Sequence, residues 1–259
     1  FNSTGGRIGS ETKINQSASL LSPHPRITMN YVGFEATTVI PFVVTWEHSS
    51  DGLTTDIKAA MMYVDYADVV SPVPASDVDN EKDVNTYTTN NQSSPQVAMS
   101  ATGEFIITWA GEGTTPSGNH IWYQAYDINV STIGVNTKVN SSTVTAASKP
   151  SVAAQKKAVA FGDGLSRYLF ISYDGSSVDD SAGIYGRSIE CIDVTCTLGA
   201  VELSINSTTS GTQTLSDVEM DYLGNFTVVW QDSALDGSGK GIYGQSFSFN
   251  DGYPYGALS

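Results

Sequence analysis

The sequence predicts an all-β protein, a β-propeller-like array of about four four-stranded blades with nearly no helix. The first observation is a fourfold repeat, in which an Asn preceded by a β-branched residue lies twelve positions before another β-branched residue. The second is an apolar strand in each repeat that ends in an aromatic residue. The third is the composition of the short runs, which are rich in Val, Ile, Thr and aromatic residues, whereas no segment has the 3.6-residue period of a helix. A small sheet cannot bury both faces alone, so the copies should stack around an axis.

Each repeat has the same order of elements. It begins at the Asn turn, with spacings of Asn15 to Ile27, Asn85 to Val97, Asn140 to Val152 and Asn206 to Val218. The second strand ends at the aromatic residue, which is Trp46, Trp109, Tyr173 or Trp230. A third strand opens on Ile57, Ile121, Ile184 or Ile242, and a Gly-bearing strand leads to the next Asn. We predict that the Pro-x-Val segment is the inner strand, that the Gly-bearing strand is outermost, and that the aromatic residue packs between blades.

The repeat also divides the chain, which we interpret as a single repeat domain over residues 1–259. Residues 1–15 form an outer strand shared with another blade, 16–86 the first repeat, 87–140 the second, 141–206 the third, and 207–259 the fourth with an overlapping tail. The tail Phe249–Gly252 resembles the head Phe1–Thr4. Three arrangements stay open: a closed four-bladed ring, a fragment of a longer array, and a subunit whose spare strand pairs with a neighbour.

The composition argues against some classes of binding partner. The chain has 259 residues, 12 Lys and Arg against 27 Asp and Glu, and a formal charge of −15. This acidic balance argues against nucleic acid and anionic membranes as partners, because both require positive charge. No apolar run approaches the roughly 20 residues of a membrane span. The chain begins at Phe1 in the middle of the repeat pattern, so it looks like a processed or excised piece of something longer.

A family resemblance is carried by the fourth repeat, in GNFTVVWQDSALDGSGKGIYGQSF (Gly224–Phe247). The second repeat keeps GEFIITW and IWYQAY, and the third keeps KPSVAA and GIYGRS. This pattern resembles the tandem repeats of large secreted microbial surface and adhesin-type proteins, which often accompany calcium-binding and adhesion modules. The resemblance implies an extracellular, propeller-like repeat protein. It implies no catalytic mechanism, because the pattern consists of packing and turn residues.

Two further features favour an extracellular protein. Seven Asn-x-Ser/Thr sequons are candidate glycosylation sites: Asn2, Asn15, Asn91, Asn129, Asn140, Asn206 and Asn225. At Asn15, Asn140 and Asn206 the alternative is a turn residue whose side chain caps its own backbone. Cys191 and Cys196, in CIDVTC, are predicted to form a disulfide across the end of a hairpin, with two free thiols as the alternative.

The loops after the aromatic residues are acidic and should lie on one face of the ring. Carboxylates in such loops could hold Ca²⁺, with Asp232, Asp236, Asp179 and Asp180 as the candidate ligands, and no other cofactor is expected. The alternative is that these residues form hairpin turns and keep the surface charged. Trp122 and the Tyr253–Tyr255 tail lie outside the packing position, so they are candidates for an exposed surface.

Catalytic motifs are missing, so we predict no catalytic residue and a protein that is not an enzyme. The main hypothesis is a glycosylated extracellular structural or adhesive protein, such as a filament, sheath or surface-layer subunit, whose edge strands join copies of itself or neighbouring surface proteins. One alternative is a carbohydrate- or calcium-dependent binding module of a larger adhesin. The other is a secreted glycosidase with two carboxylates across a pocket, for which Glu47, Glu112, Glu202 and Asp221 are available.

Overall fold

The chain folds into four antiparallel β-sheets. The computed structural model describes residues 11, 13–21, 23–29, 39–65, 72–73, 81–113, 118–156, 159–161, 164–235, 237, 239–250 and 253–257. All regular structure in these residues is β, which confirms the predicted fold class. In this part of the chain no helix has the length and apolarity needed to cross a bilayer.

Each sheet has a path of four strands in chain order. The first contains β1 (Arg26–Met29), β2 (Val39–His48), β3 (Asp56–Asp65) and β4 (Pro72–Val73), and β5 (Glu81–Asp83) also pairs with β3. The second contains β6 (Gln92–Met99), β7 (Phe105–Gly111), β8 (His120–Tyr126) and β9 (Thr132–Lys138). The third contains β10 (Thr145–Ala154), β12 (Gly164–Ser176), β13 (Gly183–Ile192) and β14 (Thr195–Leu198), to which β11 (Val159–Phe161) and β15 (Leu203–Ser204) are added. The fourth contains β16 (Gln213–Met220), β17 (Phe226–Asp232), β18 (Gly241–Asn250) and β19 (Tyr253–Ala257).

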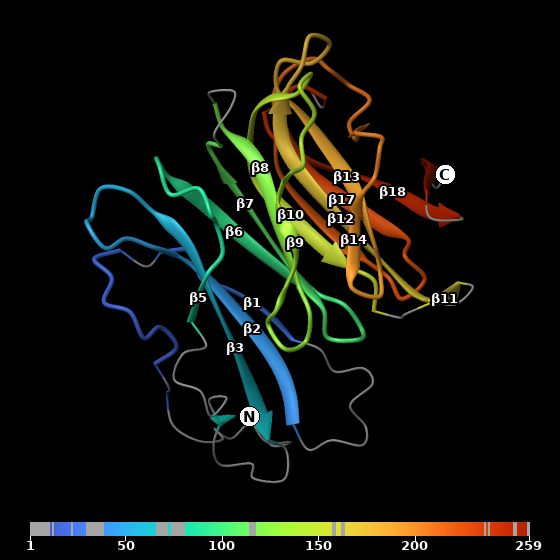
Figure 1. The fold of residues 1–259 in the computed structure, drawn as a ribbon. Coiled ribbons are helices and arrows are strands. Elements are labelled where there is room, and N and C mark those ends of the chain that lie inside the picture. Colours follow the sequence, from blue (N-terminus) through green and yellow to red (C-terminus); the bar gives the residue numbers. More distant parts are fainter. Residues whose placement is uncertain are drawn as a thin grey trace.

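The sheets follow one another as blades. The first strands of successive sheets lie against one another, β1 against β6, β6 against β10 and β10 against β16, so these strands line the axis as predicted. Among the described strands, those in close contact between sheets all belong to consecutive sheets. Figure 1 shows the first sheet in blue and the fourth in orange-red at opposite ends of the array. The described strands therefore form an arc, and the predicted outer strand of residues 1–15 lies mostly outside the described residues.

The core lies between the sheets. One apolar cluster joins the first and second sheets and contains Trp109, one joins the second and third and contains Tyr173, and one joins the third and fourth and contains Trp230. Trp46 is buried in the first sheet. The four aromatic residues have matching registers, because each lies opposite the residue that follows the opening Ile of the third strand: Lys58, Trp122, Tyr185 and Tyr243. Each aromatic residue thus occupies the same place in its own sheet.

The side chain of the repeated Asn links the third strand of its sheet to the turn that follows. The Oδ1 atoms of Asn85, Asn140 and Asn206 accept the backbone N–H of Ile57, Ile121 and Ile184, at 2.6, 3.0 and 2.7 Å. Their Nδ2 atoms donate to nearby carbonyls, such as those of Tyr87 and Thr208. All three side chains are buried, so the Asn satisfies backbone N–H groups that water cannot reach.

The inner strands carry β-bulges that the sequence pattern did not predict. The register of β6 shifts between Ser93 and Gln96, and that of β16 shifts between Thr214 and Asp217. The residue three positions before the β-branched residue of each inner strand has a positive φ: His24, Ser94, Lys149 and Leu215. A bulge turns the start of the strand away from the regular ladder, so it re-aims side chains at one end of the array.

Candidate functional site

An open pocket lies at the boundary between the first and second sheets, where β2 and β7 end and β3, β6 and β8 begin. Its volume is about 650 Å³, and polar side chains dominate its walls. It is lined by Leu21, Glu47, Leu53, Thr54, Thr55, Asn90, Asn91, Ser93, Glu112 and Asn119. The pocket therefore brings together two of the four carboxylates that the sequence made available for catalysis, Glu47 and Glu112.

Glu47 is held in place by two contacts to its Oε1 atom. The backbone N–H of Ser94, the bulge residue of β6, donates to it at 2.7 Å, and Nδ1 of His24 lies 3.0 Å away. The side chain is almost completely buried, although it lines the pocket. Asp174 occupies the same position in the third sheet, where Leu215 N–H donates to it at 3.1 Å. Glu47 thus also fixes the inner strand of the next sheet.

Glu112 is the more accessible carboxylate. It follows the last residue of β7 and is half-buried. Asn90 Nδ2 donates to its Oε2 at 2.7 Å, and Asn90 itself has a positive φ of 64° just before β6 begins. Asn91 also lines the pocket, where its Oδ1 accepts the N–H of Thr55 at 3.1 Å. The pocket therefore offers two carboxylates and several amides, which are the groups that bind the hydroxyls of a polar ligand.

The other two available carboxylates have separate roles. Glu202 accepts hydrogen bonds from Ser141 N–H at 2.9 Å and from the Tyr173 hydroxyl. Desolvation and the nearby Glu202 carboxylate raise the pKa of Tyr173. Asp221 lies in the turn before β17, where its Oδ1 accepts the N–H groups of Leu223 and Asn225 at 2.8 and 2.9 Å. Neither residue lines the pocket.

Three of the four predicted calcium ligands lie within the described residues. Within the described ranges, no group of three or more His, Cys, Asp or Glu side chains is placed to hold a metal ion. Asp232 is buried. Burial alone would raise the pKa of its carboxyl, but hydrogen bonds from Ala234, Gln213 and Leu235 lower it. Asp180 accepts Asn206 Nδ2 at 2.7 Å, whereas Asp179 is exposed. Asp236 lies outside the described residues.

The sequons differ in their surroundings. Asn91 and Asn129 are exposed, Asn15 is half-buried, and Asn225 donates from its Nδ2 to Asp221 at 2.8 Å. Asn140 and Asn206 are buried, and each Nδ2 has more than one hydrogen-bond partner, so a glycan, which replaces one of the two Nδ2 hydrogens, would cost at least one of these bonds. Asn2 lies outside the described residues, as do the side chains of Tyr253 and Tyr255. Trp122 is half-buried against the cluster between the first and second sheets, where its Nε1 donates to Gly111 O at 3.1 Å.

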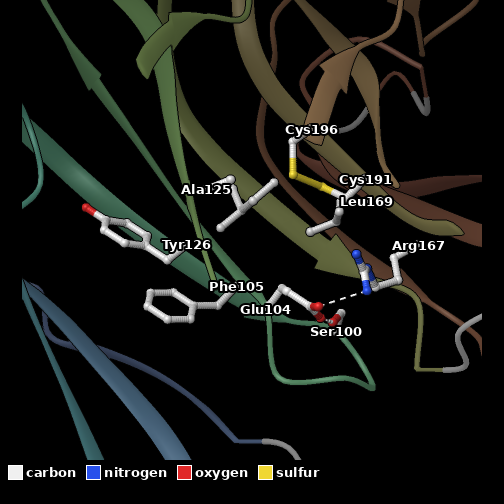
Figure 2. A pocket seen from close by; sticks show the side chains of 10 residues that line it. Ser100, Glu104, Phe105, Ala125, Tyr126, Arg167, Leu169, Cys191 and Cys196 are labelled. Carbon is white, nitrogen blue, oxygen red and sulfur yellow. Dashed lines mark hydrogen bonds and ion pairs between the residues drawn. A yellow bond between two sulfur atoms is a disulfide. The ribbon is translucent and has the colours of Figure 1, made fainter. Parts of the chain in front are cut away.

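The predicted disulfide between Cys191 and Cys196 is confirmed. It joins β13 to β14 beside a second hollow, which Figure 2 shows with the ion pair between Arg167 and Glu104. Arg167 is buried, and its Nη1 lies 2.8 Å from Glu104 Oε1. This hollow has a volume of only about 10 Å³, so it has no room for a ligand larger than water. The pair therefore serves to tie the second sheet to the third.

Comparisons with known proteins find distant structural similarity only. No protein-family model matches the chain, and no curated protein matches it. The chain is similar to a thermostable family-43 glycoside hydrolase, with 11% identity and a TM-score of 0.46 over 90% of this chain and 73% of that one. It is also similar to an α-L-arabinofuranosidase from Lactobacillus brevis, with 12% identity and a TM-score of 0.44 over 87% and 73% of the two chains. An endo-arabinase from Bacteroides thetaiotaomicron matches with 12% identity and a TM-score of 0.43, over 86% and 75%.

At these identities and TM-scores, no residue role is transferred from those enzymes to this chain. The prediction that this protein is not an enzyme is not kept: the solved structures that the comparison finds are named as glycoside hydrolases. The prediction rested on missing motifs and on repeat residues that pack and turn. Such residues determine a fold, whereas chemistry depends on the loops at its ends. The resemblance to secreted surface-protein repeats stays a prediction.

Proposed function

We propose that the protein is an extracellular glycoside hydrolase whose active site is the pocket between the first and second sheets. The observation that carries the proposal is that Glu47 and Glu112, from successive sheets, line the same open polar pocket. Glycoside hydrolysis needs two carboxyl groups that flank the glycosidic bond. The disulfide supports an oxidising compartment, which an extracellular enzyme would share.

The contacts of the two residues suggest different roles. Glu47 Oε1 accepts a backbone N–H, so this carboxylate is suited to activate water or to attack the sugar. Glu112 is more accessible and is oriented through one amide, so it is suited to donate a proton to the leaving oxygen. Asn91 and Asn119, also in the pocket, would bind sugar hydroxyls.

The test is hydrolysis of a polysaccharide panel that includes arabinan, xylan and mannan, followed by release of reducing ends. We expect Glu112→Gln and Glu47→Gln to lower the rate by roughly 10²- to 10⁴-fold, because each removes one carboxyl group from the pair. Gln keeps an oxygen that can accept the Ser94 N–H, so the bulge of β6 should persist.

Asp174→Asn is the matched control, because Asp174 has the same place and backbone contact as Glu47 but lies outside the pocket. This variant should keep full activity. Wild-type protein that cleaves no member of the panel, or a Glu112→Gln variant that cleaves as fast as wild type, would contradict the proposal.

A further inference from the structure

The two ends of the arc expose apolar positions that are buried at every internal junction between sheets. We call the face of a sheet that packs on the following sheet its back, and the opposite face its front. At an internal junction, the back of one sheet contributes its third strand, and the front of the next sheet contributes its inner strand. The first sheet has a front and the fourth sheet has a back that no described strand of another sheet closely contacts.

The back of the fourth sheet differs from its counterparts in exposure. Ile57, Ile121 and Ile184 open the third strands of the first three sheets, and each has 0% of its surface exposed. Ile242 holds the same position in the fourth sheet and is 75% exposed. The residue before the packing aromatic is the polar Thr45, Thr108 or Ser172 in the first three sheets. It is 0% exposed in the first three sheets and 40% exposed in the fourth, where it is Val229.

The front of the first sheet shows the complementary difference. The inner strands of the later sheets contribute Val97, Val152 and Val218 to the clusters that they form with the preceding sheet. Ile27 is their counterpart and is 62% exposed. Two residues further along, Met99, Ala154 and Met220 are buried, whereas Met29 is 47% exposed.

The exposed residues match the two sides of an internal junction. Inside the arc, Ile57 shares a cluster with Val97 and Met99. Ile121 likewise shares one with Val152 and Ala154, and Ile184 shares one with Val218 and Met220. By the same rule, Ile242 would share a cluster with Ile27 and Met29. Within one chain these residues belong to the first and fourth sheets, which lie at opposite ends of the arc (Figure 1).

We infer that the back of the fourth sheet binds the front of the first sheet of a second copy of this chain. The contact repeats the internal junction, so each copy continues the stacking of the one before it. Such an interface joins two different surfaces, and it can therefore extend from copy to copy until it closes into a ring or continues as a filament. None of the four residues lines the pocket between the first and second sheets, so the inference is independent of the proposed function.

The test uses two variants of the full chain, each blocked at one end. Ile242→Asn with Val229→Asn blocks the back of the fourth sheet, and Ile27→Asn with Met29→Asn blocks the front of the first. Asn is neutral, so the net charge is unchanged, and all four positions are exposed, so the sheets should still fold, which far-UV circular dichroism checks. Light scattering coupled to size-exclusion chromatography measures the mass from micromolar to millimolar concentration.

We expect the mass of wild type to rise with concentration and each blocked variant to stay monomeric. An equimolar mixture of the two variants has one intact back and one intact front, so it should form dimers and nothing larger. Val178→Asn changes a fully exposed apolar residue in the loop after β12, so it should assemble as wild type does. The inference is overturned if wild type stays monomeric, if the mixture stays monomeric, or if a blocked variant assembles normally.

Discussion

At the scale of the residue, the repeated Asn makes the same backbone contact in three of the four sheets. Its side chain satisfies a buried N–H at the start of the third strand and a partly buried carbonyl in the following turn. An unsatisfied buried polar group costs about 1–3 kcal/mol. This cost explains why one amide residue recurs at a fixed distance from the inner strand, independently of any glycan.

Replacement of this side chain should therefore destabilise the fold. We expect Asn206→Ala to lower the free energy of unfolding by about 2 kcal/mol or more, since it leaves Ile184 N–H and Thr208 C=O without their partner. Urea denaturation measures the change. Asn15→Ala is the control, because the Asn15 Nδ2 bond to Ser17 O is long, at 3.4 Å, and partly exposed, so its loss should cost under about 0.5 kcal/mol. Equal losses in the two variants would contradict the role of burial.

At the scale of the element, a side chain four positions before each Asn fastens one sheet to the preceding turn. Glu81 Oε2 accepts the N–H groups of Gln16 and Ser17, at 2.6 and 3.0 Å. Asn136 Oδ1 accepts Thr86 N–H at 2.6 Å, and Glu202 Oε1 accepts Ser141 N–H at 2.9 Å. Each acceptor comes from an outer part of its sheet, so the contact links the turn that leaves one blade to the edge of the next.

This contact should make the stability of the first sheet depend on pH. Burial opposes ionisation of Glu81, but hydrogen bonds from Ser17, Gln16 and Lys58 outweigh it and lower its pKa from 4.5 to about 2. The folded pKa lies below the unfolded one, so the stabilisation is complete above about pH 4.5 and is lost as the pH falls toward 2. The loss of stability in Glu81→Gln should be clear at pH 7 and small near pH 2, as measured by urea denaturation at each pH.

Glu219→Gln serves as the control for this prediction, because Glu219 is an exposed Glu of β16 and its replacement removes the same charge. It should change stability little at either pH. A Glu81→Gln variant that is destabilised equally at pH 7 and near pH 2 would show that the carboxylate charge does not matter.

The order of strands, the aromatic position and the Asn turn were predictable, because burial and turn geometry demand the same residue types in each copy. The bulges were not, because His24, Ser94, Lys149 and Leu215 share a positive φ but no residue type. The pocket was not predictable either, because Glu47 follows its aromatic residue directly and Glu112 comes three positions after its own, so only the fold brings them together.

At the scale of the whole molecule, net charge opposes the association that the sheet faces favour. Each copy carries a formal charge of −15, so two copies repel each other as they approach. The residues at the proposed interface, Ile242, Val229, Ile27 and Met29, are apolar and form no ion pairs that salt would weaken. Salt should therefore screen the repulsion and leave the attraction intact.

We accordingly expect association to tighten as the ionic strength rises. Between about 20 and 200 mM NaCl the Debye length falls from about 20 Å to about 7 Å, which should strengthen self-association by roughly tenfold or more. Sedimentation equilibrium of wild type at the two salt concentrations measures the change, and the end-blocked Ile242→Asn, Val229→Asn variant should stay monomeric at both. Association that weakens with salt would instead indicate charged contacts, and the copies would then meet through a surface other than these two sheet faces.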